Sequence, residues 1–179
     1  MADDEELMVR VGRGDHVAYQ TLVSRHLSRA IGLATRIVGN RGDGEELAQE
    51  AFLRVWTTAP RWRPEGAKFR TWFSRVLVNL CIDRKRRPGW SPLEAAGDPA
   101  DPSAGAFETV STGEDANRIR AAMAELPERQ RAALALCYWG EQGNIEAAAT
   151  LGISVGALES LLVRARRTLR EKLEASGGR

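Results

Sequence analysis

The segment from Phe69 to Arg87, FRTWFSRVLVNLCIDRKRR, combines an apolar stripe with side chains that suit nucleic-acid binding. On a continuous helix, one side predicts a core face made of Phe69, Phe73, Val76, Leu77 and Leu80. A neighbouring flank, about 60° wide, carries Trp72, Arg75, Asn79 and Arg86. A flat ring can stack on a base, an amide can bond to a base edge and a guanidinium can hold phosphate. The alternative is that this flank is a solvated surface of an ordinary helix.

Helices must position this flank, because apolar residues recur at three- and four-residue spacing and no alternating strand pattern occurs in the sequence. The pattern predicts four helices in the first half, at 4–11, 16–38, 45–58 and 69–86. It predicts four more in the second half, at 114–125, 128–138, 144–151 and 155–174. We therefore expect an all-α protein of two small helical bundles joined by a flexible linker.

Residues 88–114 form the predicted linker, because they hold four prolines and show no regular apolar period. This segment carries five acidic and no basic residues, whereas residues 1–87 carry 16 Lys/Arg against 11 Asp/Glu. The net charge of +2 therefore conceals a basic first half, whose local field can hold phosphate. As a flexible coil the linker spans about 30 Å, so the two halves can act at separated points.

The last two predicted helices form a helix-turn-helix, because Gly152 can adopt the left-handed conformation and Ser154 can cap the next helix. The core face predicted for the second of these helices consists of Val155, Leu158, Leu162, Ala165, Leu169 and Leu173. Its other faces carry Ser160, Val163, Arg164, Arg166, Arg167 and Arg170. Such groups suit a recognition helix in a DNA major groove. A charged, solvated face of a bundle helix is the alternative.

A different surface is predicted for the segment at 43–56, DGEELAQEAFLRVW. Glu46, Gln49 and Glu50 lie along one side of its helix, where carboxylates would repel phosphate. This side therefore suits a basic protein partner, although a solvated face is the simpler alternative. The residues available for packing include Leu47, Phe52 and Trp56.

Composition argues against several classes of function. No apolar run approaches the ~18 residues of a membrane span, and the start MADDEEL does not resemble a signal peptide. We therefore expect a cytoplasmic protein without stable membrane insertion. Cys81 and Cys137 are predicted to be buried thiols, and no histidine lies at ligand spacing beside them, so we expect no metal and no cofactor. No nucleophile with a base and no glycine-rich phosphate loop is recognisable, which argues against an enzyme.

Taken together, these motifs resemble the extracytoplasmic-function (ECF) class of bacterial sigma factors in the sigma-70 family, the promoter-specificity subunits of RNA polymerase. DEELMVRVGRGDHVAYQTLVSRH is similar to the opening helices of that class, and DGEELAQEAFLRVW to its polymerase-clamp-binding helix. FRTWFSRVLVNLCIDRKRR resembles its promoter-melting helix. LPERQRAALAL and LGISVGALESLLVRARRTLREKL resemble the domain that reads the upstream promoter element.

The resemblance implies that residues 1–87 bind core polymerase and melt the downstream promoter element, 88–114 link the domains, and 115–179 read the upstream element. The residues implied in core polymerase binding are Glu46, Leu47, Gln49, Glu50, Phe52 and Trp56. Those implied at the downstream element are Trp62, Lys68, Trp72, Arg75, Asn79, Arg84, Lys85, Arg86 and Arg87. Those implied at the upstream element are Ser154, Ser160, Arg164, Arg166, Arg167 and Arg170.

The implied function is that of a sigma factor that binds core RNA polymerase, directs it to promoter DNA and promotes strand opening, with an anti-sigma factor as a further partner. The recognition helix departs from the family, because Glu159, Leu161 and Val163 stand where many members carry basic residues. Two other functions fit the residues alone. One is an autonomous helix-turn-helix regulator with an N-terminal dimerisation or sensing domain, and the other is a helical adaptor that binds only proteins.

Overall fold

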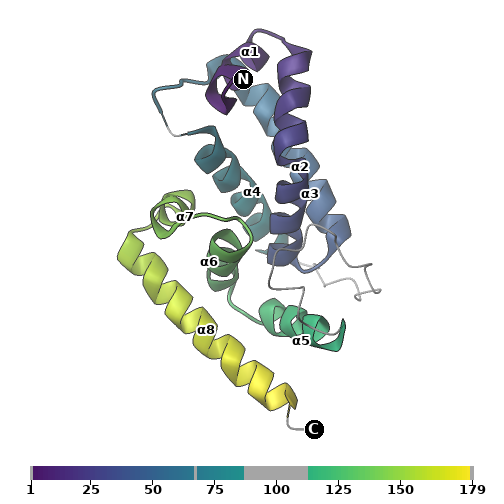
Figure 1. The fold of residues 1–179 in the computed structure, drawn as a ribbon, viewed down its shortest axis with the longest axis vertical. Coiled ribbons are helices and arrows are strands. Elements are labelled where there is room, and N and C mark those ends of the chain that lie inside the picture. Colours follow the sequence, from purple (N-terminus) through teal and green to yellow (C-terminus); the bar gives the residue numbers. More distant parts are fainter. Residues whose placement is uncertain (1, 67, 87–112, 178–179) are drawn as a thin grey trace.

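This computed structural model describes residues 2–66, 68–86 and 113–177, and all of its regular elements within those residues are helices (Figure 1). The first group consists of α1 (Asp4–Gly12), α2 (His16–Val38), α3 (Arg41–Thr58), the short 3-10 helix η1 (Ala59–Arg61) and α4 (Phe69–Arg86). The second group consists of α5 (Gly113–Ala124), α6 (Glu128–Tyr138), α7 (Asn144–Leu151) and α8 (Val155–Gly177). The predicted all-α fold is confirmed. Residues 88–112 of the predicted linker lie outside the described residues.

Local side-chain caps determine where the N-terminal helices begin. Asp3 accepts a hydrogen bond from the amide of Glu6 at 2.7 Å and so caps α1. Asp15 accepts from the amides of Val17 and Ala18 at 2.9 and 3.0 Å and caps α2 in the same way. These bonds satisfy amides that have no partner within the helix. The pKa of Asp15 is lowered, mainly by the Ala18 amide and by the Arg10 side chain.

Helix α3 begins four residues earlier than the sequence predicts, at Arg41 instead of Glu45. Asn40 caps the extra turn by accepting a hydrogen bond from the amide of Asp43 at 2.8 Å. Gly44 is part of this turn because α2 crosses it closely, and a Cβ there would lie 2.8 Å from the backbone nitrogen of Thr35. This glycine therefore permits helix contact and does not break the helix.

Aromatic rings from three helices form the centre of the first group. Phe69 and Phe73 of α4 stack with ring centroids 5.6 Å apart, and Phe52 of α3 lies 4.7 Å from Phe73. His26 of α2 packs 5.3 Å from Phe69. Burial of such rings contributes most of the packing energy of a small bundle. The predicted core face of α4 is confirmed, with Val76 only half-buried.

The two helical groups pack directly against each other, which the sequence did not predict. Helix α6 packs on α2, and α7 packs on α4 (Figure 1). The side chain of Gln142 is buried between the groups, donating to the hydroxyl of Ser74 at 2.9 Å and accepting from Thr150 at 3.0 Å. Buried polar groups are costly unless they are bonded, so this network specifies one docking geometry.

A buried arginine lies at the centre of the contact between α6 and α2. Arg131 is 3% exposed and donates to the carbonyls of Ile37 at 2.9 Å and Leu126 at 2.8 Å, and also to that of Ala124. Among the described residues no carboxylate pairs with it. Its bonds to Ile37 and Ala124 place the charge at the C-terminal ends of α2 and α5, where a cation is favourable. Burial lowers the pKa of Arg131 to about 10, so it is charged at neutral pH.

Within the described residues, no single helix has both the length and the apolar character to cross a membrane. The bent pair formed by α7 and α8, with 96° between its helices, meets that test only when both helices are taken together.

We expect Arg131→Ala to lower the free energy of unfolding by about 2–4 kcal/mol, because three buried carbonyls lose charged donors. Urea denaturation followed by circular dichroism measures this change. Arg129→Ala, at an exposed position of the same helix, is the matched control and should stay within about 0.5 kcal/mol. Equal losses in the two variants would contradict the role given to Arg131.

Candidate functional site

The flank of α4 presents polar side chains to solvent, as the helical pattern predicts. Arg75 and Asn79 are both exposed. Trp72 is half-buried and packs edge-on against Trp62, from the loop before α4, with ring centroids 5.3 Å apart. The indole nitrogen of Trp62 is buried and has no hydrogen-bond partner among the described residues. Lys68 is exposed directly before the helix.

The basic end of α4 differs from the prediction. Arg84 pairs with Asp43 at 2.8 Å and with Glu46 at 2.7 Å, and its side chain is only 17% exposed. The hydrogen bond that Arg84 donates to Glu46 raises the pKa of the Arg84 guanidinium. In this conformation the guanidinium of Arg84 is paired with two carboxylates of α3, so a DNA contact would require these pairs to break, and the DNA-binding role of Arg84 stays a prediction.

Two further residues of that basic cluster, Lys85 and Arg86, also have partners within the chain. Arg86 pairs with Glu128 of α6 at 3.1 Å. Lys85 is half-buried. Arg87 lies outside the described residues. The basic cluster is therefore largely engaged within the chain.

Helix α3 exposes only part of the set predicted to bind polymerase. Glu46 and Gln49 are exposed, and Glu50 is partly exposed and pairs with Arg54 at 3.1 Å. Leu47 and Phe52, by contrast, are 1% and 4% exposed. These two residues pack in the core, so in this conformation they can only support the polymerase-binding side from below, and the polymerase contact itself stays a prediction.

Two hydrophobic residues border the exposed side of α3. Trp56 is half-buried and stacks on His16 with ring centroids 4.9 Å apart. Leu53 is 64% exposed and was missed by the sequence analysis. Its spacing, four residues after Gln49 and three after Glu50, places it on the same side of the helix and could have revealed it. This leucine adds apolar surface to a side of α3 that otherwise exposes polar groups.

The predicted helix-turn-helix joint is confirmed. Gly152 ends α7 in the left-handed conformation with φ of 65°, and the hydroxyl of Ser154 accepts from the amide of Ala157 at 3.1 Å. In α8, Leu158, Leu162 and Ala165 are buried as predicted. Val155 is 37% exposed, so its assignment to the core face is wrong, because the first turn of α8 buries only Leu158 against the bundle and leaves positions 155–157 facing solvent.

The exposed side of α8 carries most of the residues predicted to bind the upstream element: Ser160, Arg164, Arg166, Arg167 and Arg170. Arg166 donates to the hydroxyl of Tyr138 at 3.0 Å and lies over its ring, so it has a partner on α6. Leu169 and Leu173 are half-buried and line an open apolar groove of about 550 Å³ between α5, α6 and α8, instead of a closed core. The remaining arginines can reach a partner without breaking these contacts.

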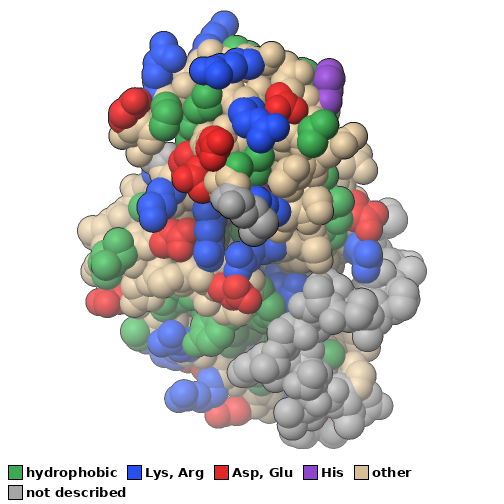
Figure 2. All heavy atoms as spheres, turned by 45° about the horizontal axis from the view of Figure 1, so that its top comes forward, with side chains coloured by type: hydrophobic (Ala, Val, Ile, Leu, Met, Phe, Trp, Pro, Cys, Tyr) green, Lys and Arg blue, Asp and Glu red, His purple; other side chains and the backbone are tan. Residues whose placement is uncertain are grey.

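The surface of the described residues is of mixed charge, and the cysteines are the remaining groups with potential reactivity. Basic and acidic side chains alternate over the face drawn in Figure 2. Among the described residues, no group of three His, Cys, Asp or Glu side chains could hold a metal. Cys81 is buried, and its burial raises the pKa of the thiol to about 12, so it is not a ready nucleophile. Cys137 is only partly buried, and the predicted pair of buried thiols is confirmed for Cys81 alone.

Comparison with known proteins adds independent evidence of relationship. The family description "Sigma-70 region 2" matches residues 22–91, and "Sigma-70, region 4" matches residues 116–169. The chain is 30% identical over 185 residues to the ECF RNA polymerase sigma factor SigW of Bacillus subtilis, covering 94% of this chain and 98% of SigW. This chain belongs to the ECF class of RNA polymerase sigma factors. The sigma factor is also 35% identical over 170 residues to the ECF sigma factor SigE of Mycolicibacterium smegmatis.

The extent of these matches differs. The SigE match covers 89% of this sigma factor, which spans 64% of the length of SigE. Among solved structures, the fold matches that of CnrH, determined in complex with the cytosolic domain of CnrY, with a TM-score of 0.73 and 26% identity. That match covers 96% of this sigma factor and 97% of CnrH. The two family regions coincide with most of the two helical groups, with α1 preceding the first match.

We expect Arg84→Met to lower the free energy of unfolding of this sigma factor by about 1–2 kcal/mol, because Asp43 and Glu46 would face each other without their cation. Thermal and urea denaturation measure the loss, and Arg120→Met, at an exposed position of α5, is the control. If Arg84 instead binds phosphate, stability will be unchanged and the affinity for single-stranded DNA will fall.

Proposed function

We propose that this protein binds core RNA polymerase, directs it to promoters with two separate elements and promotes strand opening. One observation carries the proposal: a single chain holds the two sigma regions in order, with an acidic and amide surface on α3 and an arginine-rich surface on α8. A regulator that acts without polymerase would have no need of the first region. Membership of the sigma family also favours a regulatory subunit over an enzyme.

The polymerase contact is proposed for the exposed side of α3. Gln49, Glu50 and Leu53 combine an amide, a carboxylate and an apolar anchor on adjacent helical positions. A buried apolar centre with polar neighbours is the usual composition of a protein interface. Glu46 lies at the edge of this surface. Both of its carboxylate oxygens accept hydrogen bonds from Arg84, so this side chain is less available to a polymerase partner.

The downstream promoter element is proposed to meet the exposed flank of α4 and the loop before it. Trp62 and Trp72 supply rings for stacking, while Asn79 supplies donors and an acceptor for one base edge. Removing a base from the stack costs a few kcal/mol, and stacking returns about 1–3 kcal/mol per base. Strand opening therefore requires binding energy and no covalent chemistry.

The upstream element is proposed to meet α8 through Ser160, Arg164, Arg167 and Arg170, which are exposed on the recognition helix. Ser154 contributes as the cap that positions this helix, since its hydroxyl already accepts from Ala157. An anti-sigma factor is proposed as a further partner. The sigma-like fold of CnrH, solved with the cytosolic domain of CnrY, shows that a similar chain can hold a second protein.

Transcription in vitro with purified core polymerase and genomic fragments tests the proposal. We expect run-off products from a subset of fragments that appear only when both this chain and core polymerase are present. Specific, nanomolar binding of duplex DNA by the free chain, without any effect on core polymerase, would instead support an autonomous regulator.

Replacing Gln49 by Ala and Glu50 by Lys should weaken binding to core polymerase by about tenfold or more, because the surface loses an amide and reverses a charge. Stability should change by only about 0.5 kcal/mol per site, since both side chains contact solvent. Co-purification and a binding titration measure the effect. Glu171→Lys on α8 is the control for a reversed charge, and equal binding by wild type and the double variant would contradict the α3 assignment.

Replacing Asn79 by Ala should remove discrimination of about 1–3 kcal/mol at one base of the downstream element, while folding and polymerase binding persist. Permanganate footprinting of open complexes, with all four bases tested at each downstream position, measures the preference. A mismatched bubble removes the cost of strand separation, but the variant should still lack the base preference on such templates, because the preference comes from reading the base edge. Asn117→Ala on α5 is the control, and an unchanged base preference would leave Asn79 without a reading role.

A further inference from the structure

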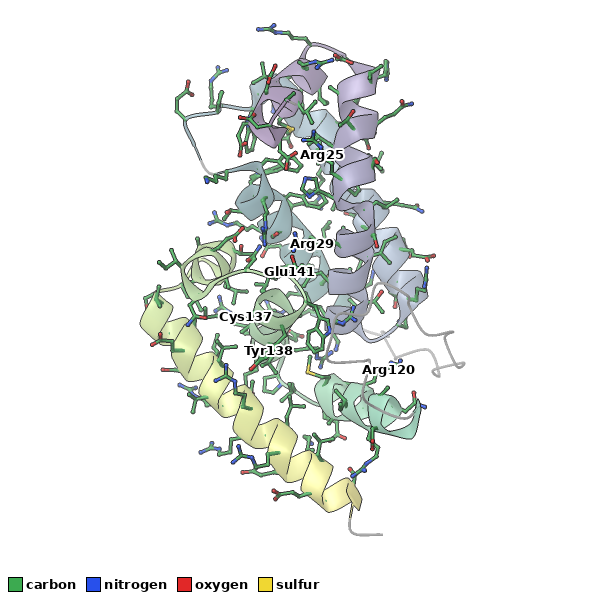
Figure 3. All side chains as sticks on the ribbon, in the orientation of Figure 1. Arg25, Arg29, Arg120, Cys137, Tyr138 and Glu141 are labelled. Carbon is green, nitrogen blue, oxygen red and sulfur yellow. The ribbon has the colours of Figure 1, made fainter. Side chains whose placement is uncertain are left out.

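The face of the first helical group that meets the second group carries three arginines, and each is held by negative groups. Arg29 of α2 forms an ion pair with Glu141, and Figure 3 shows these two side chains pointing toward each other. Arg70 of α4 lies 3.1 Å from the carboxylate of Glu146. Arg75 donates to the carbonyl of Ala149, near the C-terminal end of α7.

The partners of these arginines come from one short segment, the α6–α7 loop together with α7. Besides Glu146, Arg70 binds the carbonyls of Gly140 and Glu141, at 2.9 and 2.8 Å. The segment therefore presents two carboxylates and several carbonyl oxygens to the three guanidiniums. An array of negatively charged and partly negative oxygens is also what a nucleic-acid backbone presents to arginine.

The α6–α7 loop is held in a specific conformation for this contact. Glu141 has φ of 49°, the only positive value of a non-glycine residue among the described residues. Gly140 is required beside it, since a Cβ there would lie 2.5 Å from the carbonyl oxygen of Leu136. Gln142 then inserts its amide against Ser74. Unfavourable backbone conformations persist only where surrounding contacts stabilise them.

We propose that the α6–α7 loop and α7 act as an internal substitute for DNA phosphate. They occupy a phosphate-binding surface formed by Arg29, Arg70 and Arg75 until promoter DNA displaces them. The inference rests on the proposed function, because the competitor is promoter DNA. Arg29 and Arg70 thereby join the proposed DNA-binding surface. While the two helical groups are packed together, this surface is covered and DNA binding is inhibited.

Geometry and charge both favour competition over simultaneous binding. Arg75 lies on the same flank of α4 as Asn79, so α7 sits beside the surface proposed to read the opened strand. DNA that reaches Arg75 must displace the carbonyl of Ala149. The ion pairs to Arg29 and Arg70 involve exposed or half-exposed groups, which contribute only modestly and can be exchanged for phosphate.

The test compares the full chain with Glu141→Gln/Glu146→Gln, which removes both carboxylates without changing side-chain size. The charge-matched control is Glu6→Gln/Glu174→Gln, at exposed positions of α1 and α8 away from Arg29, Arg70 and Arg75. One readout is the radius of gyration from small-angle X-ray scattering. The other is the fluorescence anisotropy of a labelled single-stranded DNA oligonucleotide of mixed sequence.

We expect the loop variant to expand and to bind the oligonucleotide about three- to tenfold more tightly than wild type, because a larger fraction of molecules is open. The control should resemble wild type in both readouts. Adding Arg29→Gln and Arg70→Gln to the loop variant should abolish the gain in affinity. Ser74→Ala, which removes the partner of Gln142 from the first group, should independently shift both readouts in the same direction as the loop variant.

A loop variant that stays as compact and binds as weakly as wild type would overturn the proposal. An equal gain in the control would also overturn it, because the effect would then be one of net charge. Transcription with core polymerase tests the proposed function separately. A chain that supports transcription but shows no response to the loop variant would refute only the self-inhibition.

Discussion

The arrangement of the whole molecule depends on burying the guanidinium of Arg131 without a carboxylate. Moving a charge out of water costs several kcal/mol, so the site is stable only while three carbonyls surround the group. One of these carbonyls belongs to the end of α5, one to the turn between α5 and α6, and the third to the end of α2. One side chain therefore closes the second helical group and attaches it to the first.

This attachment has a direct consequence for DNA binding. Two promoter elements separated by about two helical turns lie roughly 70 Å apart, at about 34 Å per turn. In the packed arrangement α7 contacts α4, so the two DNA-reading surfaces cannot reach such separated elements together. The groups must therefore move apart on a two-part promoter. That step would break the bond from Arg131 to the carbonyl of Ile37, so this buried arginine opposes separation of the two groups.

Ion pairs between helices also engage basic side chains of α4 in this conformation. Arg84 joins α4 to α3 through Asp43 and Glu46, and Arg86 joins α4 to α6 through Glu128. An arginine on a basic helix end has two possible partners, a neighbouring carboxylate or a nucleic-acid phosphate. Proximity within the chain favours the carboxylate. The groups that stay exposed, such as Asn79, Lys68 and the arginines of α8, are then the better candidates for reading DNA.

The sequence by itself determined the helices, because periodicity and caps are local properties. The predicted bounds of α2, α4, α6 and α7 match the structure, and the turn at Gly152 and Ser154 does too. The resemblance to ECF sigma factors also rested on short motifs in order. Only the tertiary structure decided which polar groups are engaged, because their partners are distant in the chain. Arg131 reaches Ile37 across 94 residues, and Gln142 reaches Ser74 across 68. No local pattern encodes such pairs, since they exist only once the two helical groups have packed.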